Sequence, residues 1–480
     1  MLCRFSVIAH NRRYGYRPSK TYRVSYTHTP RLTFRHQQQQ DCRDAEPGAG
    51  RESQQRALAH TWACIVRRTS IPDVLRTNVS VVGESMIGDL GITEVHLGMI
   101  FSAFALGYAL FQIPGGILGD NIGSRRALAI IAAGWAVLTM FTAMVPGTDY
   151  LSVGGIVGLL LVLRFLVGVT HAPVFPVTTG GTIANWFPTG GWGLPVGLSS
   201  TGLTLGAAAT APLLVWLMEM FGWRGALLVT APSALLLAAV WWWYVRDYPR
   251  DHRSVSTNEQ ALIDAGRPPP EYERVSGAWK IAIKNRDVLL LAGSYFCTNY
   301  VFYLFFNWFF FYLVSVRGFS AADAGLLTSA QWIIGAVGAT AGGFICDRLT
   351  RRYGLRWGPR WLAIPSLVLC AMFLVLGATS GNMILTVVFL CICFGCTQLT
   401  EAAYWATTMA VSGRHASAAT GILNTGGNVV GFAGGMMVPL IASVWGWTVS
   451  VSTGAVFALV AALLWLLIRG DRQMMHTNGA

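Results

Sequence analysis

Charged residues are scarce in this chain of 480 residues, and their scarcity excludes a soluble protein. Asp, Glu, Lys and Arg together make up 12% of the sequence, against about 25% in ordinary soluble domains. Hydrophobic residues make up 53%, and the mean hydropathy is +0.49. So few charges would not cover the surface of a water-soluble fold of this size. Most of the chain is therefore expected to lie in a lipid bilayer.

The sequence also lacks the motifs of enzymes and of pumps driven by ATP. It contains no glycine-rich phosphate loop, no convincing cluster of metal ligands and no nucleophile paired with a base. The segment Cys391–Cys396 has a C-x-x-C spacing, but it lies in an uncharged run with no histidine nearby. This context favours buried small side chains over a metal or redox site. We expect no enzymatic activity, no metal and no cofactor.

The net charge of +13 is concentrated near the N-terminus. Residues 1–70 hold 13 Lys and Arg against 4 Asp and Glu, which accounts for nine of the excess positive charges. No surface of alternating aromatic and basic residues accompanies them, which argues against nucleic acid as a partner. We interpret residues 1–70 as a basic polar extension that is disordered or results from a wrong start, frameshift or splice junction. A transit peptide is the alternative.

Apolar runs dominate the rest of the chain, and eleven of them are long enough to cross the roughly 30 Å hydrocarbon core of a bilayer. They lie near 95–118, 126–146, 152–177, 192–217, 225–245, 287–315, 322–346, 361–380, 383–411, 416–443 and 447–468. The polar connection 246–286 divides them into an N-terminal bundle, 71–245, and a C-terminal bundle, 287–469, followed by a tail, 470–480. We predict an all-α polytopic membrane protein of two six-helix bundles.

The first of these twelve helices is degenerate. It should come from residues 57–88, but its longest uncharged stretch, Ala57–Val66, has only ten residues. Basic residues elsewhere recur in alternate loops, among them Arg246, Arg351, Arg414 and Arg469. Loops rich in Lys and Arg face the cytoplasm. We therefore expect a multi-pass protein of the plasma or bacterial inner membrane with a cytoplasmic C-terminus.

The two halves carry the same short motif. Gly116–Asp120 and Gly343–Asp347 both have the pattern Gly-x-x-x-Asp, 227 residues apart, and arginines follow each of them. Duplicated halves with a substrate site between them are frequent in transporters. The glycine permits close approach of helices, and the aspartate can pair with an arginine of a neighbouring helix. We predict a conformational latch at the cytoplasmic loops, made of Gly116, Asp120, Gly123, Arg125, Arg126, Gly343, Asp347 and Arg348.

Several further motifs occur in a characteristic order between residues 76 and 468. They are Phe101–Tyr108, Gln112–Gly116, Arg164, Phe175–Pro176, Trp186–Pro188, Gly222–Arg224, Arg317–Gly318, Tyr404–Ala406 and Asn424. The sequence thereby resembles the anion:cation symporter branch of the major facilitator superfamily, which includes sialin, vesicular glutamate transporters and bacterial permeases for sugar acids such as galactonate and glucarate. The resemblance implies secondary active transport of a small organic anion by alternating access, coupled to a proton or another cation.

The same resemblance implies where the anion binds. It assigns substrate contacts to Arg76, Tyr108, Arg164, Tyr295, Trp405 and Asn424. A guanidinium suits a carboxylate because its planar donors meet both oxygens and it stays charged. Alternatively, Arg164 forms a purely structural pair with a neighbouring helix and does not bind substrate.

Two residues depart from the branch at positions associated with proton movement. Leu75 replaces an aspartate, and His171 replaces the glutamate of many relatives. His171 follows Arg164 by seven residues and so lies on the same helical face; an imidazole with a pKa of about 6.5 can carry a proton. Glu401, the only acid inside the run 383–411, is the second candidate. Static packing is an alternative for both residues, and uniport, exchange or potential-driven flux stay open.

Two other functions remain consistent with the sequence. One is export of an aromatic or drug-like compound, with Arg164 structural and the aromatic residues forming the pocket. The other is a membrane sensor or scaffold without transport, which the degenerate first helix and the missing acids suggest. The expected partners are a small organic anion, a proton and the lipid bilayer, and the expected assembly is a monomer.

Overall fold

The computed structural model describes residues 76–174, 177–178, 182, 184–186, 193–253, 255, 257, 260–261, 263, 278–412 and 416–470. All of them belong to one compact unit, Arg56–Ala480. Every regular element in this described part is a helix. The predicted extension 1–70 lies outside it, as does the predicted tail apart from Gly470.

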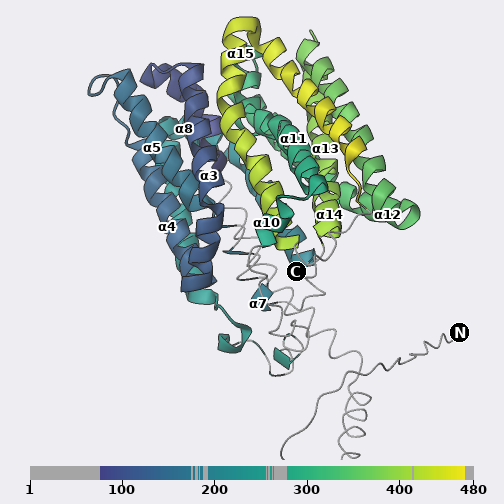
Figure 1. Ribbon diagram of the computed structural model, residues 1–480. Coiled ribbons are helices and arrows are strands. Elements are labelled where there is room, and N and C mark those ends of the chain that lie inside the picture. The colour runs from purple at the N-terminus through teal and green to yellow at the C-terminus, as the bar shows by residue number, and fades with distance from the viewer. Residues whose placement is uncertain are drawn as a thin grey trace, which may run out of the picture. The chain divides into compact units, whose positions relative to one another are not determined.

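The described helices form two groups. The first helix comprises residues 76–90. The elements after it are α3 (Glu94–Ile122), α4 (Ser124–Ala143), α5 (Val153–His171), α7 (Ala184–Trp186), α8 (Gly193–Tyr244), η3 (Pro249–Asp251), α10 (Ala278–Ala282), α11 (Arg286–Phe311), η4 (Tyr312–Val316), α12 (Ala321–Thr379), α13 (Met383–Leu399), α14 (Glu401–Ser412) and α15 (Ala416–Leu467). Figure 1 shows α3, α4, α5 and α8 packed as one group and α11 to α15 as the other.

Glycines divide the longest helices into separate membrane segments. Eight helices of the described part are long and apolar enough to cross a membrane. Three of them contain a glycine with positive φ: Gly222 in α8, Gly354 in α12 and Gly446 in α15. Residues with a Cβ rarely adopt such a φ, so these glycines mark where one segment ends and the next begins. The eleven resulting segments coincide with the eleven predicted apolar runs, which confirms the predicted fold class.

The positive-φ glycines also reveal the duplication of the halves. The described part contains six of them, and they form three pairs that are 224 to 231 residues apart: Gly91 with Gly318, Gly123 with Gly354, and Gly222 with Gly446. The first pair lies between the first and second helices of each half, the second pair between the second and third, and the third pair between the fifth and sixth. The prediction of duplicated halves, based on the repeated Gly-x-x-x-Asp, therefore agrees with the backbone.

In each half, an arginine at the start of the third membrane helix caps the end of the sixth, if residues 76–90 count as the first helix of the first half. Arg125 on α4 donates from Nε to the carbonyl oxygen of Trp242, at 2.9 Å. Arg360 on α12 donates from Nη2 to the carbonyl oxygens of Leu466, at 3.1 Å, and Ile468. The last carbonyls of a helix have no partner inside it, and a cation there also opposes the helix dipole. Each half is thus tied together at the same end.

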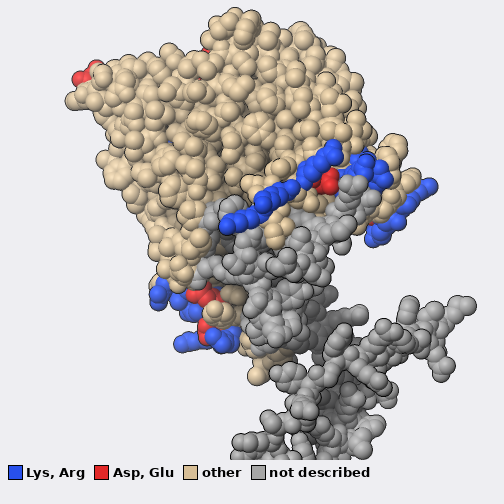
Figure 2. All heavy atoms as spheres, viewed as in Figure 1, with Lys and Arg blue, Asp and Glu red and all other residues tan. Residues whose placement is uncertain are grey.

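The basic residues gather at that end of the helices. Figure 2 shows Lys and Arg following one edge of the described surface. The exposed ones there include Arg126, Lys280, Lys284, Arg286, Arg348, Arg351, Arg352 and Arg356. This clustering is typical of cytoplasmic loops.

The halves touch through small residues on α3 and α15 and on α8 and α12. A Cβ added to Gly98 of α3 would lie 2.5 Å from the carbonyl oxygen of Gly435 on α15. Ser329 of α12 donates to the carbonyl oxygen of Ala208 on α8. Larger side chains at these positions would push the halves apart. Close contact between small residues is the usual way in which helices associate in lipid.

Candidate functional site

Two predicted substrate residues, Arg76 and Arg164, line one pocket between the halves. The other lining residues are Ser80, Phe101, Phe104, Phe306 and Asn307. Phe306 and Asn307 come from α11 of the second half, whereas the remainder come from the first half. The structure therefore brings both predicted arginines together where the two halves meet.

Arg164 is a buried cation with weak partners. Its exposed fraction is 4%. Nη1 donates to Oδ1 of Asn78 and Nη2 to the backbone oxygen of Arg76, both at 3.4 Å, at the long end of hydrogen bonding. Nε has no hydrogen-bond partner, and no carboxylate within the described residues forms an ion pair with this guanidinium. A buried charge without a counter-ion is costly, and an anionic ligand would relieve that cost.

The helix α5 directs Arg164 and His171 into the bundle. It begins after Ser152, whose side chain accepts a hydrogen bond from the backbone N–H of Gly155 at 3.3 Å. Its buried residues recur at helical spacing: Ile156, Val157, Leu160, Leu163, Arg164, Val167, Gly168 and His171. The sequence expectation that Arg164 and His171 share a face is confirmed.

Aromatic rings form the walls around the two arginines. The Cζ of Arg76 lies 4.7 Å from the ring centre of Phe306, 5.5 Å from that of Tyr108 and 6.0 Å from that of Phe104. The Cζ of Arg164 lies 5.4 Å from the ring centre of Phe104. A cation over a ring face gains electrostatic attraction. Tyr108, a predicted substrate contact, is thus part of this wall.

His171 packs among aromatic rings and has no hydrogen bond to the described residues. Its ring centre lies 4.8 Å from that of Trp135, 5.9 Å from that of Tyr108 and 6.0 Å from that of Phe104. Close packing of α3 against α5 sets these distances, because a Cβ on Gly168 would lie 2.1 Å from the backbone oxygen of Phe104. The sequence did not identify Trp135, whose role depends on contact between helices far apart in the chain.

The second half holds a buried acid. Both carboxylate oxygens of Glu401 accept from the hydroxyl of Tyr295, at 3.2 Å, and Oε2 also accepts from Nε1 of Trp405, at 3.0 Å. Three predicted residues thus meet in one cluster. No Lys or Arg of the described part of the chain forms an ion pair with Glu401.

A chain of amides joins the halves through Asn424. Its Nδ2 donates to Oε1 of Gln112 on α3 at 2.9 Å. Asn428, one turn later on α15, donates to Oδ1 of Asn424 at 3.1 Å and accepts from the hydroxyl of Tyr303 at 2.8 Å. Sequence reasoning assigned only Asn424. The four-residue spacing of the asparagines was the available signal for Asn428, whereas Gln112 is 312 residues from its partner.

The predicted latch is arranged differently from the expectation. The surroundings of Gly116 and the side chain of Asp120 lie outside the described part. Arg126, Asp347 and Arg348 are exposed, and none of them makes an ion pair with a described residue. The side chain of Arg125 caps α8 at Trp242 and forms no ion pair with a described aspartate.

Two contacts expected of the latch, close helix approach at a glycine and hydrogen bonding by an aspartate at a helix end, are made by other residues nearby. A Cβ on Gly343 would meet nothing within 4 Å, so this glycine does not mediate close packing. Gly342 does: its Cβ would lie 2.3 Å from the backbone oxygen of Leu399. Asp247 accepts hydrogen bonds from the hydroxyl of Ser124 at 3.0 Å and the N–H of Arg125 at 2.8 Å, beside Gly123.

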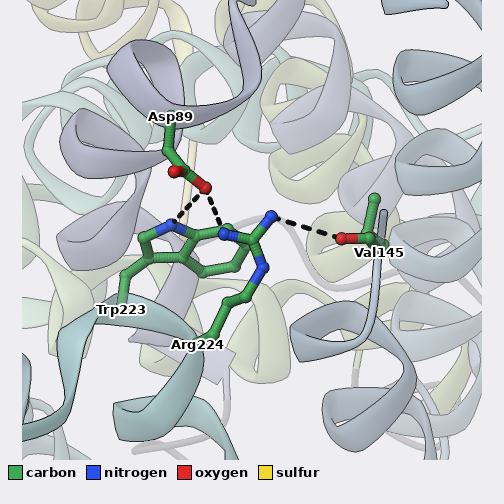
Figure 3. A network of polar contacts seen from close by, with 4 residues as sticks. All are labelled: Asp89, Val145, Trp223 and Arg224. Carbon is green, nitrogen blue, oxygen red and sulfur yellow. Dashed lines mark hydrogen bonds and ion pairs between the residues drawn. The ribbon is translucent and has the colours of Figure 1, made fainter. Parts of the chain in front are cut away.

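An ion pair fixes the opposite end of the first half (Figure 3). Asp89 accepts from Nε1 of Trp223 at 3.1 Å and pairs with the guanidinium of Arg224. Arg224 also donates to the carbonyl oxygen of Val145 at 3.3 Å. The turn at Gly222 places both donors next to Asp89. The motif Gly222–Arg224 therefore ties the first helix to α8 and to the end of α4.

Solved structures with the same arrangement are membrane transporters. A bacterial homologue of the human lysosomal transporter Spinster, in an inward-facing and unoccupied conformation, superposes with a TM-score of 0.67 at 17% identity, covering 86% of this chain and 97% of that one. The nucleoside transporter NupG superposes with a TM-score of 0.63 at 13% identity, covering 85% and 99%. At these identities the likeness establishes the fold alone.

Sequence comparison supplies the family. The model of the Major Facilitator Superfamily matches residues 74–355, and the chain belongs to this superfamily. The probable sulfoacetate transporter SauU of Cupriavidus necator is 29% identical over 360 residues, 74% of this chain and 80% of the relative. The probable galactarate/D-glucarate transporter GudP of Bacillus subtilis is 29% identical over 417 residues, 84% and 90%. The D-galactonate transporter of Escherichia coli O6:H1 is 26% identical over 408 residues, 82% and 92%.

These findings confirm the resemblance found from the motifs. They also confirm that the protein is a membrane transporter and not an enzyme.

Proposed function

We propose that the protein is a secondary active transporter of a small organic anion, a sugar acid or a related carboxylate, coupled to protons. The buried guanidinium of Arg164, which no carboxylate of the described residues neutralises, carries this proposal. The relatives named as transporters of galactarate, glucarate, galactonate and sulfoacetate support it, since all of these compounds are organic anions.

Recognition would begin with the arginines. Arg164 would take two oxygens of the carboxylate, and Arg76, on the same pocket, would add a second positive charge. The polar groups of Tyr108, Trp405 and Asn424 would hydrogen-bond the hydroxyls of the substrate. Such groups discriminate strongly, because a substrate without the matching hydroxyl leaves them unpaired.

Transport would follow from movement of the two halves about this pocket. The internal caps of Arg125 and Arg360 support motion of each half as a rigid body. The contacts at Gly98 and Gly435 would open when the substrate site faces the other side of the membrane. The end with the exposed arginines would face the cytoplasm, the C-terminus would lie on that side, and the protein would span the plasma or bacterial inner membrane. A monomer contains both halves and so suffices.

Export of an aromatic compound is the second candidate. The rings of Phe101, Phe104 and Phe306 that line the pocket favour it, since a flat apolar compound would stack on them. In that case Arg164 would serve packing between helices and not binding.

The test uses purified protein in lightly buffered lipid vesicles. D-galactonate, D-glucarate, sulfoacetate and an aromatic carboxylate are added one at a time, and the external pH is recorded. Alkalinisation with one of the first three compounds, absent when Arg164 is replaced by Ala, is the expected result. The Arg351→Ala variant, which removes an exposed arginine, is the matched control. A response to the aromatic compound alone, unaffected by the loss of Arg164, would favour the second candidate.

A further inference from the structure

The surroundings of Glu401 and His171 differ in a way that distinguishes the two candidates for carrying the proton. This inference rests on the proposed function and concerns the site described above. Both side chains lie inside membrane segments, α14 and α5. A group that binds and releases a proton during transport needs partners that tolerate both of its charge states. The neighbours of each group decide whether that condition is met.

His171 is surrounded by cations and ring faces. The rings of Phe104 and Tyr108 that contact it also contact the guanidinium groups of Arg76 and Arg164. An imidazolium there would be a third positive charge against the same rings, and like charges in a buried site repel strongly. His171 has no hydrogen bond to a described residue that would take its proton. Its surroundings therefore favour a neutral ring that packs.

Glu401 has neutral donors around it instead. The titratable groups beside it are the phenol of Tyr295 on α11, which donates to the carboxylate, and the phenol of Tyr404 on α14, whose ring centre lies 5.0 Å from that of Tyr295. Trp465 of α15 packs against Tyr404, with ring centres 5.2 Å apart, and does not titrate. No Lys, Arg or His among the described residues pairs with the carboxylate. Protonation of Glu401 therefore breaks no ion pair.

The chain is interrupted beside this carboxylate. α13 ends at Leu399, Thr400 forms a turn, and α14 begins at Glu401, although the two helices form one membrane segment. Interrupted membrane helices commonly carry the substrate and ion sites of transporters. Glu401 thus lies at a point where the backbone of the segment can adjust.

We propose that Glu401 carries the coupled proton, on its Oε1 atom. Trp405 can only donate from Nε1, so Oε2 stays an acceptor. Oε1 contacts only the hydroxyl of Tyr295, which donates to the carboxylate and can rotate to accept from the protonated acid. The proton adds to Oε1 on one side of the membrane and leaves from it on the other. Trp405, a proposed substrate contact, links this step to substrate binding.

Glu401→Gln removes the proton site and preserves the shape of the side chain. With radiolabelled D-galactonate, D-glucarate or sulfoacetate, whichever the wild type exchanges, the variant is expected to keep counterflow exchange within about twofold. It should lose external alkalinisation and accumulation driven by a proton gradient. The matched control is Glu219→Gln, at an exposed position on α8. Proton-driven accumulation by Glu401→Gln at the wild-type level would overturn the proposal.

A second variant covers the case in which Glu401→Gln loses exchange as well. In Tyr295→Phe the ionised carboxylate loses a donor worth about 1.5 kcal/mol. The midpoint of uptake against pH should therefore move by about one unit to the alkaline side. An unchanged midpoint would refute the assignment to Glu401. Absence of exchange in the wild type with all three compounds would instead refute the proposed function.

Discussion

Replacing Gly168 with alanine should disturb the site without touching a polar group. The added Cβ would lie 2.1 Å from the backbone oxygen of Phe104 and 2.9 Å from the backbone nitrogen of Tyr108. Contacts between carbon and backbone atoms are normally longer by about an ångström, so α3 and α5 must separate. Overpacking of this kind costs about 1–3 kcal/mol. The separation would move Tyr108 away from His171 and Arg164.

Two measurements on the Gly168→Ala variant test this reasoning. The apparent unfolding temperature in detergent should fall, and the KM for the transported anion should rise. Gly158→Ala, on the same helix, is the matched control, because its Cβ would meet nothing within 4 Å and alanine favours a helix by about 1 kcal/mol. Wild-type stability and KM in Gly168→Ala would refute the close packing of α3 and α5.

Two further contacts lend themselves to substitution. Gln112→Ala should free Asn424 for the substrate by removing a hydrogen bond worth about 1 kcal/mol, so KM is expected to fall roughly fivefold; an unchanged KM would argue against Asn424 as a substrate contact. Asp89→Asn removes the partly exposed ion pair with Arg224, which should lower stability by about 0.2–1 kcal/mol. A thermal shift measured against Glu219→Gln would detect it, and equal unfolding temperatures would contradict a stabilising role.

The fold was predictable because its signals are local in sequence. Each membrane segment is a continuous apolar run, and the turns between segments fall at glycines such as Gly222 and Gly446. The first helix shows the limit of this approach: charges at Arg76 and Glu84 break the run, yet residues 76–90 are helical. Val82, Met86 and other side chains of this helix are buried against the bundle, which compensates for the charges.

Within the candidate site, spacing along one helix was predictable from the sequence, whereas contacts between helices were not. The placement of Arg164 and His171 on one face followed from helical spacing, and Glu401 and Trp405 are one turn apart. The bond from Tyr295 to Glu401 spans 106 residues, so it depends on how α11 packs against α14. Spacing along one helix carries no information about such contacts.

The latch was predicted less well for the same reason. A repeated Gly-x-x-x-Asp identifies the loop but not which glycine faces a neighbour. In the second half the facing residue is Gly342 and not Gly343, because helix rotation, set by packing against α13, turns the adjacent position inward.

Counterflow of a labelled organic anion by the Arg164 variants tests the central claim most directly. The vesicles are preloaded with the unlabelled compound that the wild type transports, so that neither a proton gradient nor a potential is needed. Loss of the guanidinium in Arg164→Ala should cost about 2 kcal/mol or more of binding, which raises the half-saturating concentration at least roughly thirtyfold. Arg164→Lys should restore part of it, while Arg351→Ala behaves as the wild type. Equal exchange by Arg164→Ala and the wild type would contradict an anion site at Arg164.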